Sequence, residues 1–112
     1  MLKKIECYIQ PFTLEPLTHA LVALGVDGMS VTEVRGFGRQ RGFASGQAPG
    51  QVKFTSKLKL EIVVKSDMVD GTVALIVKMA RTGTVGAGKI FVLPVENAVR
   101  IGSGETGEMA VG

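Results

Sequence analysis

The chain has 112 residues, a length that accommodates one domain with one modest hydrophobic core. Apolar residues make up 46% of the sequence, which is typical of a folded globule and excludes a disordered chain. The net charge of +3 is too small for charge alone to indicate a nucleic-acid-binding protein. No apolar run is long enough to span a membrane and no signal-peptide pattern follows Met1, so the sequence predicts a cytoplasmic protein without direct membrane insertion.

The first third of the chain predicts a strand, a helix and a second strand. Apolar residues alternate with polar ones around Cys7, which predicts a half-buried strand that ends at Pro11 and a buried thiol within it. Thr13 is the predicted N-cap of a helix that ends before Gly25. The apolar face of this helix consists of Leu14, Leu17, Leu21 and Leu24. A second strand, rich in Val and Thr, is predicted from Met29 to Phe37.

The remaining elements complete an α+β fold. A third strand is predicted to present Leu58, Leu60, Ile62 and Val64 on one face and Lys57, Lys59 and Glu61 on the other. Ser66 is the predicted cap of a second helix that Gly83 ends, with an apolar face of Val69, Val73, Ile76, Val77 and Ala80. A last strand, apolar throughout, is predicted from Lys89 to Val95. This βαββαβ order is typical of a single ferredoxin-like domain, with an antiparallel sheet and both helices on one face. The glycine-rich tail, residues 102–112, is expected to be mobile or to be ordered only by a partner.

The connection between the second and third strands, residues 38–56, is much longer than a hairpin requires, which indicates a functional loop. No acidic residue occurs between Val34 and Leu60, whereas six basic residues do: Arg35, Arg39, Arg41, Lys53, Lys57 and Lys59. Two interpretations remain open here. The cluster either attracts an anion or forms a solvated basic edge that prevents the sheet from aggregating.

A glycine-rich turn at residues 82–89 favours the anion interpretation, because its backbone amides can surround phosphate oxygens and Lys89 can neutralise them. The turn matches most of the G-x-x-x-x-G-K phosphate-loop pattern. It differs in two respects: Ile90 replaces the hydroxyl residue that binds magnesium, and the turn leads from a helix into a strand rather than from a strand into a helix. The sequence therefore does not predict a phosphate-loop hydrolase.

No catalytic constellation is evident in the sequence. His19, the single histidine, is predicted on the polar side of the first helix, and no cysteine cluster offers a metal site. Nothing marks Glu33 and Glu61 as a general acid-base pair. A slow phosphatase or ATPase and a nucleic-acid-binding protein are the alternatives to a regulatory protein. The first lacks a group that orients magnesium or water, and the second lacks stacking aromatic residues beyond Phe37, Phe43 and Phe54.

Four segments together resemble the PII signal-transduction family, over about residues 1–105. The first combines Lys3–Glu6 with Pro11 and Phe12, and the second, Gly28–Gly42, is nearly the family signature. The other two are Lys57–Val64, similar to the family's third strand, and residues 82–92, similar to its second signature, the B-loop at about residues 82–89.

The resemblance implies a non-enzymatic homotrimer that senses adenine nucleotides in clefts between subunits. A long T-loop, about residues 37–55, would then dock on target proteins in nitrogen and carbon metabolism, such as a transporter or a metabolic enzyme. By position, the adenine and ribose would be surrounded by Ser30, Gly36, Phe37, Gly38 and Val63. The phosphates of ATP, ADP or AMP would be held by Arg39, Gly86, Gly88, Lys89 and Arg100. Gln40 and Lys57 correspond to positions at which family members bind magnesium and 2-oxoglutarate beside ATP.

Departures from the family pattern point to altered ligand preference and an altered target. Ala87 replaces the usual Asp, and Gly102 replaces a second phosphate-binding Arg. Loss of that cation is expected to weaken contacts to the outer phosphates most, so that ADP or AMP competes better with ATP than in a typical member. The T-loop is slightly short and lacks the tyrosine that enteric-type members have uridylylated, so uridylylation is not expected. The alternative is a PII-like regulator of inorganic-carbon uptake or carboxysome function, with bicarbonate as second effector.

Overall fold

A computed structural model describes residues 1–37, 52–81 and 87–112 of the chain. Its helices and strands follow the predicted order: β1 (Leu2–Ile9), α1 (Leu14–Leu24), β2 (Ser30–Gly36), β3 (Thr55–Lys65), α2 (Val69–Ala80) and β4 (Lys89–Val95). Short 3₁₀ turns occupy Pro11–Thr13, Ser66–Met68 and Gly107–Ala110. The second strand is one residue shorter at each end than predicted, and the last strand has the predicted bounds.

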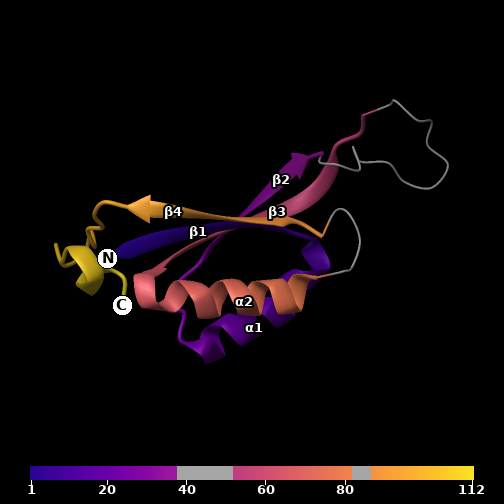
Figure 1. Cartoon of the computed structure of the whole chain (residues 1–112). Coiled ribbons are helices and arrows are strands. Elements are labelled where there is room, and N and C mark those ends of the chain that lie inside the picture. Colours follow the sequence, from indigo (N-terminus) through magenta and orange to yellow (C-terminus); the bar gives the residue numbers. More distant parts are fainter. Residues whose placement is uncertain (38–51, 82–86) are drawn as a thin grey trace.

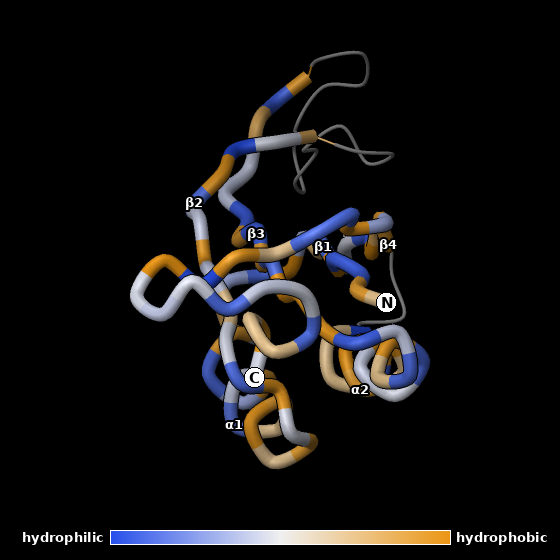
Figure 2. The backbone as a smooth tube through the Cα atoms, turned by 90° about the vertical axis from the view of Figure 1, so that its left-hand side faces the viewer, coloured by the Kyte–Doolittle hydropathy of each residue, from blue (hydrophilic) through white to orange (hydrophobic). Residues whose placement is uncertain are grey.

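The strands form one antiparallel sheet in the order β2-β3-β1-β4. Both helices pack side by side on one face of this sheet, as Figures 1 and 2 show from two directions. The central position of β1 follows from its pairing with both β3 and β4, for example through Ile5 opposite Ile62 and Val92. The predicted α+β, ferredoxin-like architecture is confirmed.

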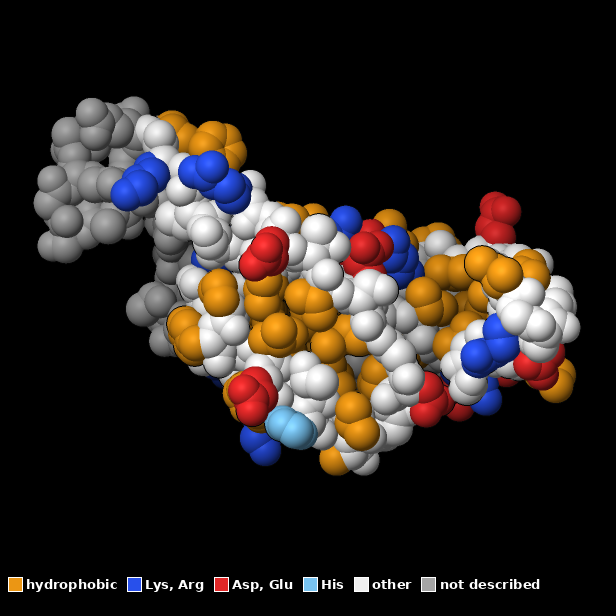
Figure 3. All heavy atoms as spheres, turned by 180° about the vertical axis from the view of Figure 1, so that it is seen from behind, with side chains coloured by type: hydrophobic (Ala, Val, Ile, Leu, Met, Phe, Trp, Pro, Cys, Tyr) orange, Lys and Arg blue, Asp and Glu red, His pale blue; other side chains and the backbone are white. Residues whose placement is uncertain are grey.

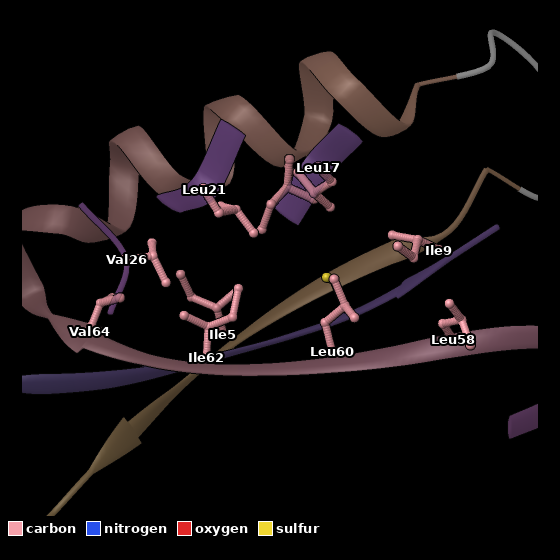
Figure 4. Close-up of a cluster of buried hydrophobic side chains, with 11 residues drawn as sticks. Ile5, Ile9, Leu17, Leu21, Val26, Leu58, Leu60, Ile62 and Val64 are labelled. Carbon is pink, nitrogen blue, oxygen red and sulfur yellow. The ribbon is translucent and has the colours of Figure 1, made fainter. Parts of the chain in front are cut away.

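The core lies between the sheet and the helices, because alternate residues of the two central strands point toward the helices. In Figure 4, Leu60 and Ile62 of β3 lie opposite Leu17 and Leu21 of α1. All the predicted inward-facing residues of β1 and β3 are buried: Ile5, Cys7, Ile9, Leu58, Leu60, Ile62 and Val64. The period-two pattern therefore identified the buried face of the sheet correctly.

The boundaries of α1 agree with its predicted caps, Thr13 and Gly25, whereas the start of α2 differs. Gly25 ends α1 as predicted, with a left-handed φ of 111°. Thr13 does not cap α1 through its side chain; it lies buried at the end of a 3₁₀ turn that precedes the helix. Ser66 likewise does not cap α2, because its hydroxyl donates to the Met1 carbonyl at 3.0 Å and a 3₁₀ turn again comes first. The helix α2 ends at Ala80, and Gly83, its predicted end, lies outside the described residues.

The C-terminal tail, which was expected to be mobile or to be ordered only by a partner, makes hydrogen bonds within the chain. Val99 pairs with Thr106, and the Gly107 N–H donates to the Ala98 carbonyl at 2.9 Å. The Glu108 carboxylate lies 2.7 Å from the Met1 amino group. In Figure 1 the tail therefore lies beside the N-terminus, at the opposite end of the sheet from the start of β4. Local hydrogen bonds compensate here for the glycine content of the segment.

No helix within the described ranges has both the length and the apolar character needed to cross a membrane.

The side chain of Thr72, in α2, is fully buried, and its hydroxyl has no hydrogen-bond partner among the described residues. A buried hydroxyl without a partner destabilises the folded state. We therefore expect Thr72→Val, which keeps the β-branched shape, to raise the free energy of unfolding by about 1 kcal/mol in urea titrations at fixed protein concentration.

The matched control for Thr72→Val is Thr18→Val in α1. The hydroxyl of Thr18 donates to the Leu14 carbonyl at 2.8 Å, so its removal should bring no comparable gain. A Thr72→Val protein that unfolds at lower urea than the unmodified chain would contradict the expectation.

Candidate functional site

The face of the sheet that the helices leave uncovered, here called the open face, carries most of the described candidate residues. Directly paired residues of neighbouring strands share a face. Lys89 pairs with Tyr8 and Ser30 pairs with Glu61, so both lie on the open face with the outward residues of β1 and β3. The outward residues of β3 are Lys57, Lys59, Glu61 and Val63.

One group of candidates gathers at the end of the sheet where β2 ends and β3 and β4 begin, here called the loop end. Gly36 pairs with Thr55, whose hydroxyl donates to the Gly36 carbonyl at 3.3 Å. Beyond this pair the rings of Phe37 and Phe54 meet edge to face, with centroids 5.3 Å apart. These contacts join the two ends of the predicted T-loop.

The loop end is also basic. Lys57 lies on β3 opposite Val34, and partial burial lowers the pKa of its ammonium group. Figure 3 shows Lys and Arg side chains gathered at this end. The described basic residues there include Arg35 and Lys53 as well as Lys57. A ligand that reaches this end therefore meets positive charge.

Gly88 and Lys89 enter β4 at the loop end, close against β1. Gly88 has a left-handed φ of 122°, and a Cβ on it would lie 1.7 Å from the Tyr8 carbonyl oxygen. Only glycine allows the backbone to approach β1 so closely. The same contact fixes the position from which the Lys89 side chain leaves the sheet.

The other candidates lie elsewhere on the sheet. Val63 is near the end of β3 opposite Lys4, and Ser30 begins the edge strand β2. Arg100 follows β4 at the far end, here called the tail end, where its main chain hydrogen-bonds to Glu105. The seven residues of β4 span roughly 20 Å between the loop end, where Lys89 lies, and the tail end, where Arg100 lies. Lys89 and Arg100 of one chain are therefore too far apart to hold one phosphate chain together.

Four candidates lie outside the described residues: Gly38, Arg39, Gln40 and Gly86. The predicted magnesium position at Gln40 is among them. Within the described ranges, no group of three or more His, Cys, Asp and Glu is arranged to hold a metal ion.

A cavity of about 350 Å³ lies between α2 and the loop end of β1 and β4, with lining that is mostly apolar and includes Cys7, Ile76 and Ala80. Burial raises the pKa of the Cys7 thiol to about 11, so at neutral pH the thiol stays protonated and is a poor nucleophile. The prediction of a buried strand thiol is confirmed.

The two acidic residues considered as a catalytic pair lie on opposite faces of the sheet. Glu33 pairs with Leu58, which faces the helices, whereas Glu61 pairs with Ser30 on the open face. Two carboxyl groups separated by the sheet cannot act on one substrate.

Sequence reasoning missed an ion-pair cluster on the open face. The Lys4 ammonium lies 3.1 Å from the Glu6 carboxylate and also contacts that of Glu61. The hydrogen bond from Lys4 lowers the pKa of Glu61. The sequence did hold a signal for this cluster. Lys4 and Glu6 alternate with the buried residues of β1, so their side chains could have been placed together on the open face.

Comparisons with known proteins agree on one family. The family model of the nitrogen regulatory protein P-II matches residues 2–105. The nitrogen regulatory protein P-II of Cereibacter sphaeroides is 52% identical over 98% of this chain and 100% of its own length. The nitrogen regulatory protein P-II 1 of Escherichia coli is 46% identical with the same coverage.

Among solved structures, Arabidopsis thaliana PII bound to citrate has a TM-score of 0.81 and 40% identity, covering 97% of this chain and 91% of that one. These relatives are named for nitrogen regulation, and the alternative of inorganic-carbon uptake or carboxysome function is not favoured.

Proposed function

This chain belongs to the PII family of nitrogen regulatory proteins, and from that premise we propose that it senses adenine nucleotides in clefts between the subunits of a homotrimer. Members of the family are signalling regulators rather than enzymes, act through partner proteins and are typically trimeric. The proposal concerns the ligand, the location of its site and the segment that transmits the signal.

The observation that carries the proposal is the separation of the candidate residues within one chain. Gly88 and Lys89 lie at the loop end of the sheet and Arg100 at the tail end. A nucleotide that uses both cations must therefore take them from two chains, which is the geometry of a site between subunits.

The exposed apolar surface of β4 supports assembly. Phe91, Val92 and Leu93 are 49%, 46% and 37% exposed in the isolated chain, although they belong to an apolar strand at the edge of the sheet. Edge strands with uncovered apolar side chains favour association with another chain. The proposed site requires a trimer in which the loop end of one subunit meets the tail end of its neighbour.

The ligand is expected to be an anion, because each end supplies a cation: Lys89 with Lys57 at the loop end, and Arg100 at the tail end. The related Arabidopsis PII was solved with citrate, an anion. Magnesium beside ATP, held in part by Gln40, and 2-oxoglutarate as second effector belong to the same proposal.

The T-loop transmits the signal in this proposal. Its two ends meet at the Phe37–Phe54 pair, next to Gly36 and Lys57, so a ligand bound there contacts the base of the loop. Nucleotides that interact differently with two arrangements of the loop shift the balance between them and thereby change the affinity for a target protein.

Calorimetric titration of the purified protein with ATP, ADP and AMP tests the proposal. We expect all three to bind, with ADP competing well against ATP, because position 102 lacks the second arginine. Gly102→Arg restores that cation at a position where a Cβ meets nothing within 4 Å, and should shift preference toward ATP. Adenylates that do not bind at millimolar concentration would refute the proposed function, and strong ATP preference in the unmodified protein would refute the expected competition.

A further inference from the structure

The guanidinium group of Arg100 is in contact with the protein's own C-terminal segment. Its Nη2 donates to the backbone oxygen of Gly112, and its Nε lies 3.8 Å from Glu105 Oε1. The side chains of Arg100 and Glu105 are 45% and 42% exposed, so the pair remains accessible to a ligand. A candidate phosphate-binding cation is thus already paired with an anion.

The position of Glu105 is set by hydrogen bonds on both sides. The Arg100 N–H donates to the Glu105 carbonyl and the Gly104 N–H donates to the Arg100 carbonyl, each at 2.8 Å. The turn between them uses Gly104 at a left-handed φ of 77°. The Ser103 hydroxyl donates to Glu105 Oε1 at 3.0 Å and orients the carboxylate. This is a built contact rather than a chance encounter of two surface side chains.

We propose that Glu105 determines nucleotide specificity, because its carboxylate competes with the ligand's phosphates for Arg100 and penalises the more highly charged nucleotide. The inference rests on the proposed nucleotide site and adds to it a residue that opposes binding. A phosphate that binds Arg100 would lie beside the carboxylate already paired with the same guanidinium group, so the two negative groups would repel each other.

Repulsion between the carboxylate and the ligand increases with each added phosphate, so Glu105 weakens ATP binding more than AMP binding. Because residue 102 is glycine, that position supplies no second guanidinium to offset the repulsion. Glu105 and Gly102 therefore act in the same direction on the preference among ATP, ADP and AMP.

Glu105→Gln is the direct test, because glutamine keeps the shape and the oxygen that accepts from Ser103 but removes the charge. The matched control is Glu108→Gln, the same charge change in the same tail at a carboxylate that pairs with the Met1 amino group instead. By calorimetry at fixed salt, Glu105→Gln should tighten ATP binding by about fivefold, with a smaller effect on AMP, whereas Glu108→Gln should leave both unchanged.

Equal ATP affinities in the Glu105→Gln and unmodified proteins would overturn the inference, as would weaker binding, which would mean that Glu105 holds Arg100 in place for the ligand. Failure of the proposed function is recognised separately, as absence of adenylate binding by the unmodified protein. Inorganic pyrophosphate then serves as the probe. Tighter pyrophosphate binding by Glu105→Gln than by Glu108→Gln would support the competition, and equal binding would exclude it.

Discussion

Replacing Gly88 with alanine is expected to destabilise the protein by about 3 kcal/mol and to displace the start of β4. Two costs combine at this position. The φ of 122° is strained for any residue with a side chain, and the added Cβ would lie 1.7 Å from the Tyr8 carbonyl oxygen and 2.9 Å from its carbon. Neither atom can move without disturbing the pairing of β1 and β4. We therefore expect Lys89 to shift, so that the affinity for adenylates falls as well as the free energy of unfolding.

Two other glycines separate these costs, measured as the free energy of unfolding in urea. Gly104 has a φ of 77° but no atom within 4 Å of a Cβ, so Gly104→Ala tests backbone strain alone. Gly28→Ala meets neither strain of this kind nor a neighbour within 4 Å and should be nearly neutral. If Gly88→Ala were no less stable than Gly104→Ala, the close approach to Tyr8 would have no energetic importance.

Mixing two variants with weakened nucleotide binding is expected to restore part of the binding. Lys89→Ala and Arg100→Ala should each lower adenylate affinity by about tenfold or more, because each removes a charge-assisted contact to phosphate. In a trimer with sites between subunits, an Arg100→Ala subunit still supplies Lys89 and a Lys89→Ala neighbour still supplies Arg100. Random co-assembly of equal amounts should therefore regenerate about a quarter of the sites at full affinity.

Complementation is measured by unfolding the two variants together, refolding them and titrating ADP. Each variant refolded alone is the first control, and Lys78→Ala, which removes an exposed lysine from α2, controls for loss of charge. A mixture that binds no better than its components would show that the two cations do not come from different subunits.

The fold was predictable from the sequence because its main signals are local. The alternation in β3 identified every second residue from Leu58 to Val64 as buried, and Gly25 identified the end of α1. Thr13 holds the predicted N-cap position of α1, although its side chain makes no capping hydrogen bond. The prediction failed at Ser66 because a 3₁₀ turn precedes α2, and the Ser66 hydroxyl bonds instead to Met1, far away in sequence. Contacts between distant segments leave no periodic trace in a single sequence.

The candidate site was less predictable for a related reason. Residue types and spacing singled out the glycine turn and the basic loop root, and family resemblance supplied the other positions. The pairing of β4 with β1 places Lys89 at one end of the sheet, and Arg100 follows the other end of β4. Neither composition nor spacing could indicate this separation. Glu105 was missed because its approach to Arg100 depends on a turn in a tail that appeared structureless from its composition.

The Phe37–Phe54 pair has a consequence for how such regulators diverge. The two rings close the base of the T-loop. The contacts that β2 and β3 make there therefore do not depend on the sequence between Phe37 and Phe54. If the T-loop contacts the target, as proposed, insertions, deletions and substitutions within that interval would alter which target is recognised while the strands beneath keep their register. On the proposed function, choice of target and stability of the sheet would then be selected separately, and exchanging the interval between homologues would change the target without destabilising the fold.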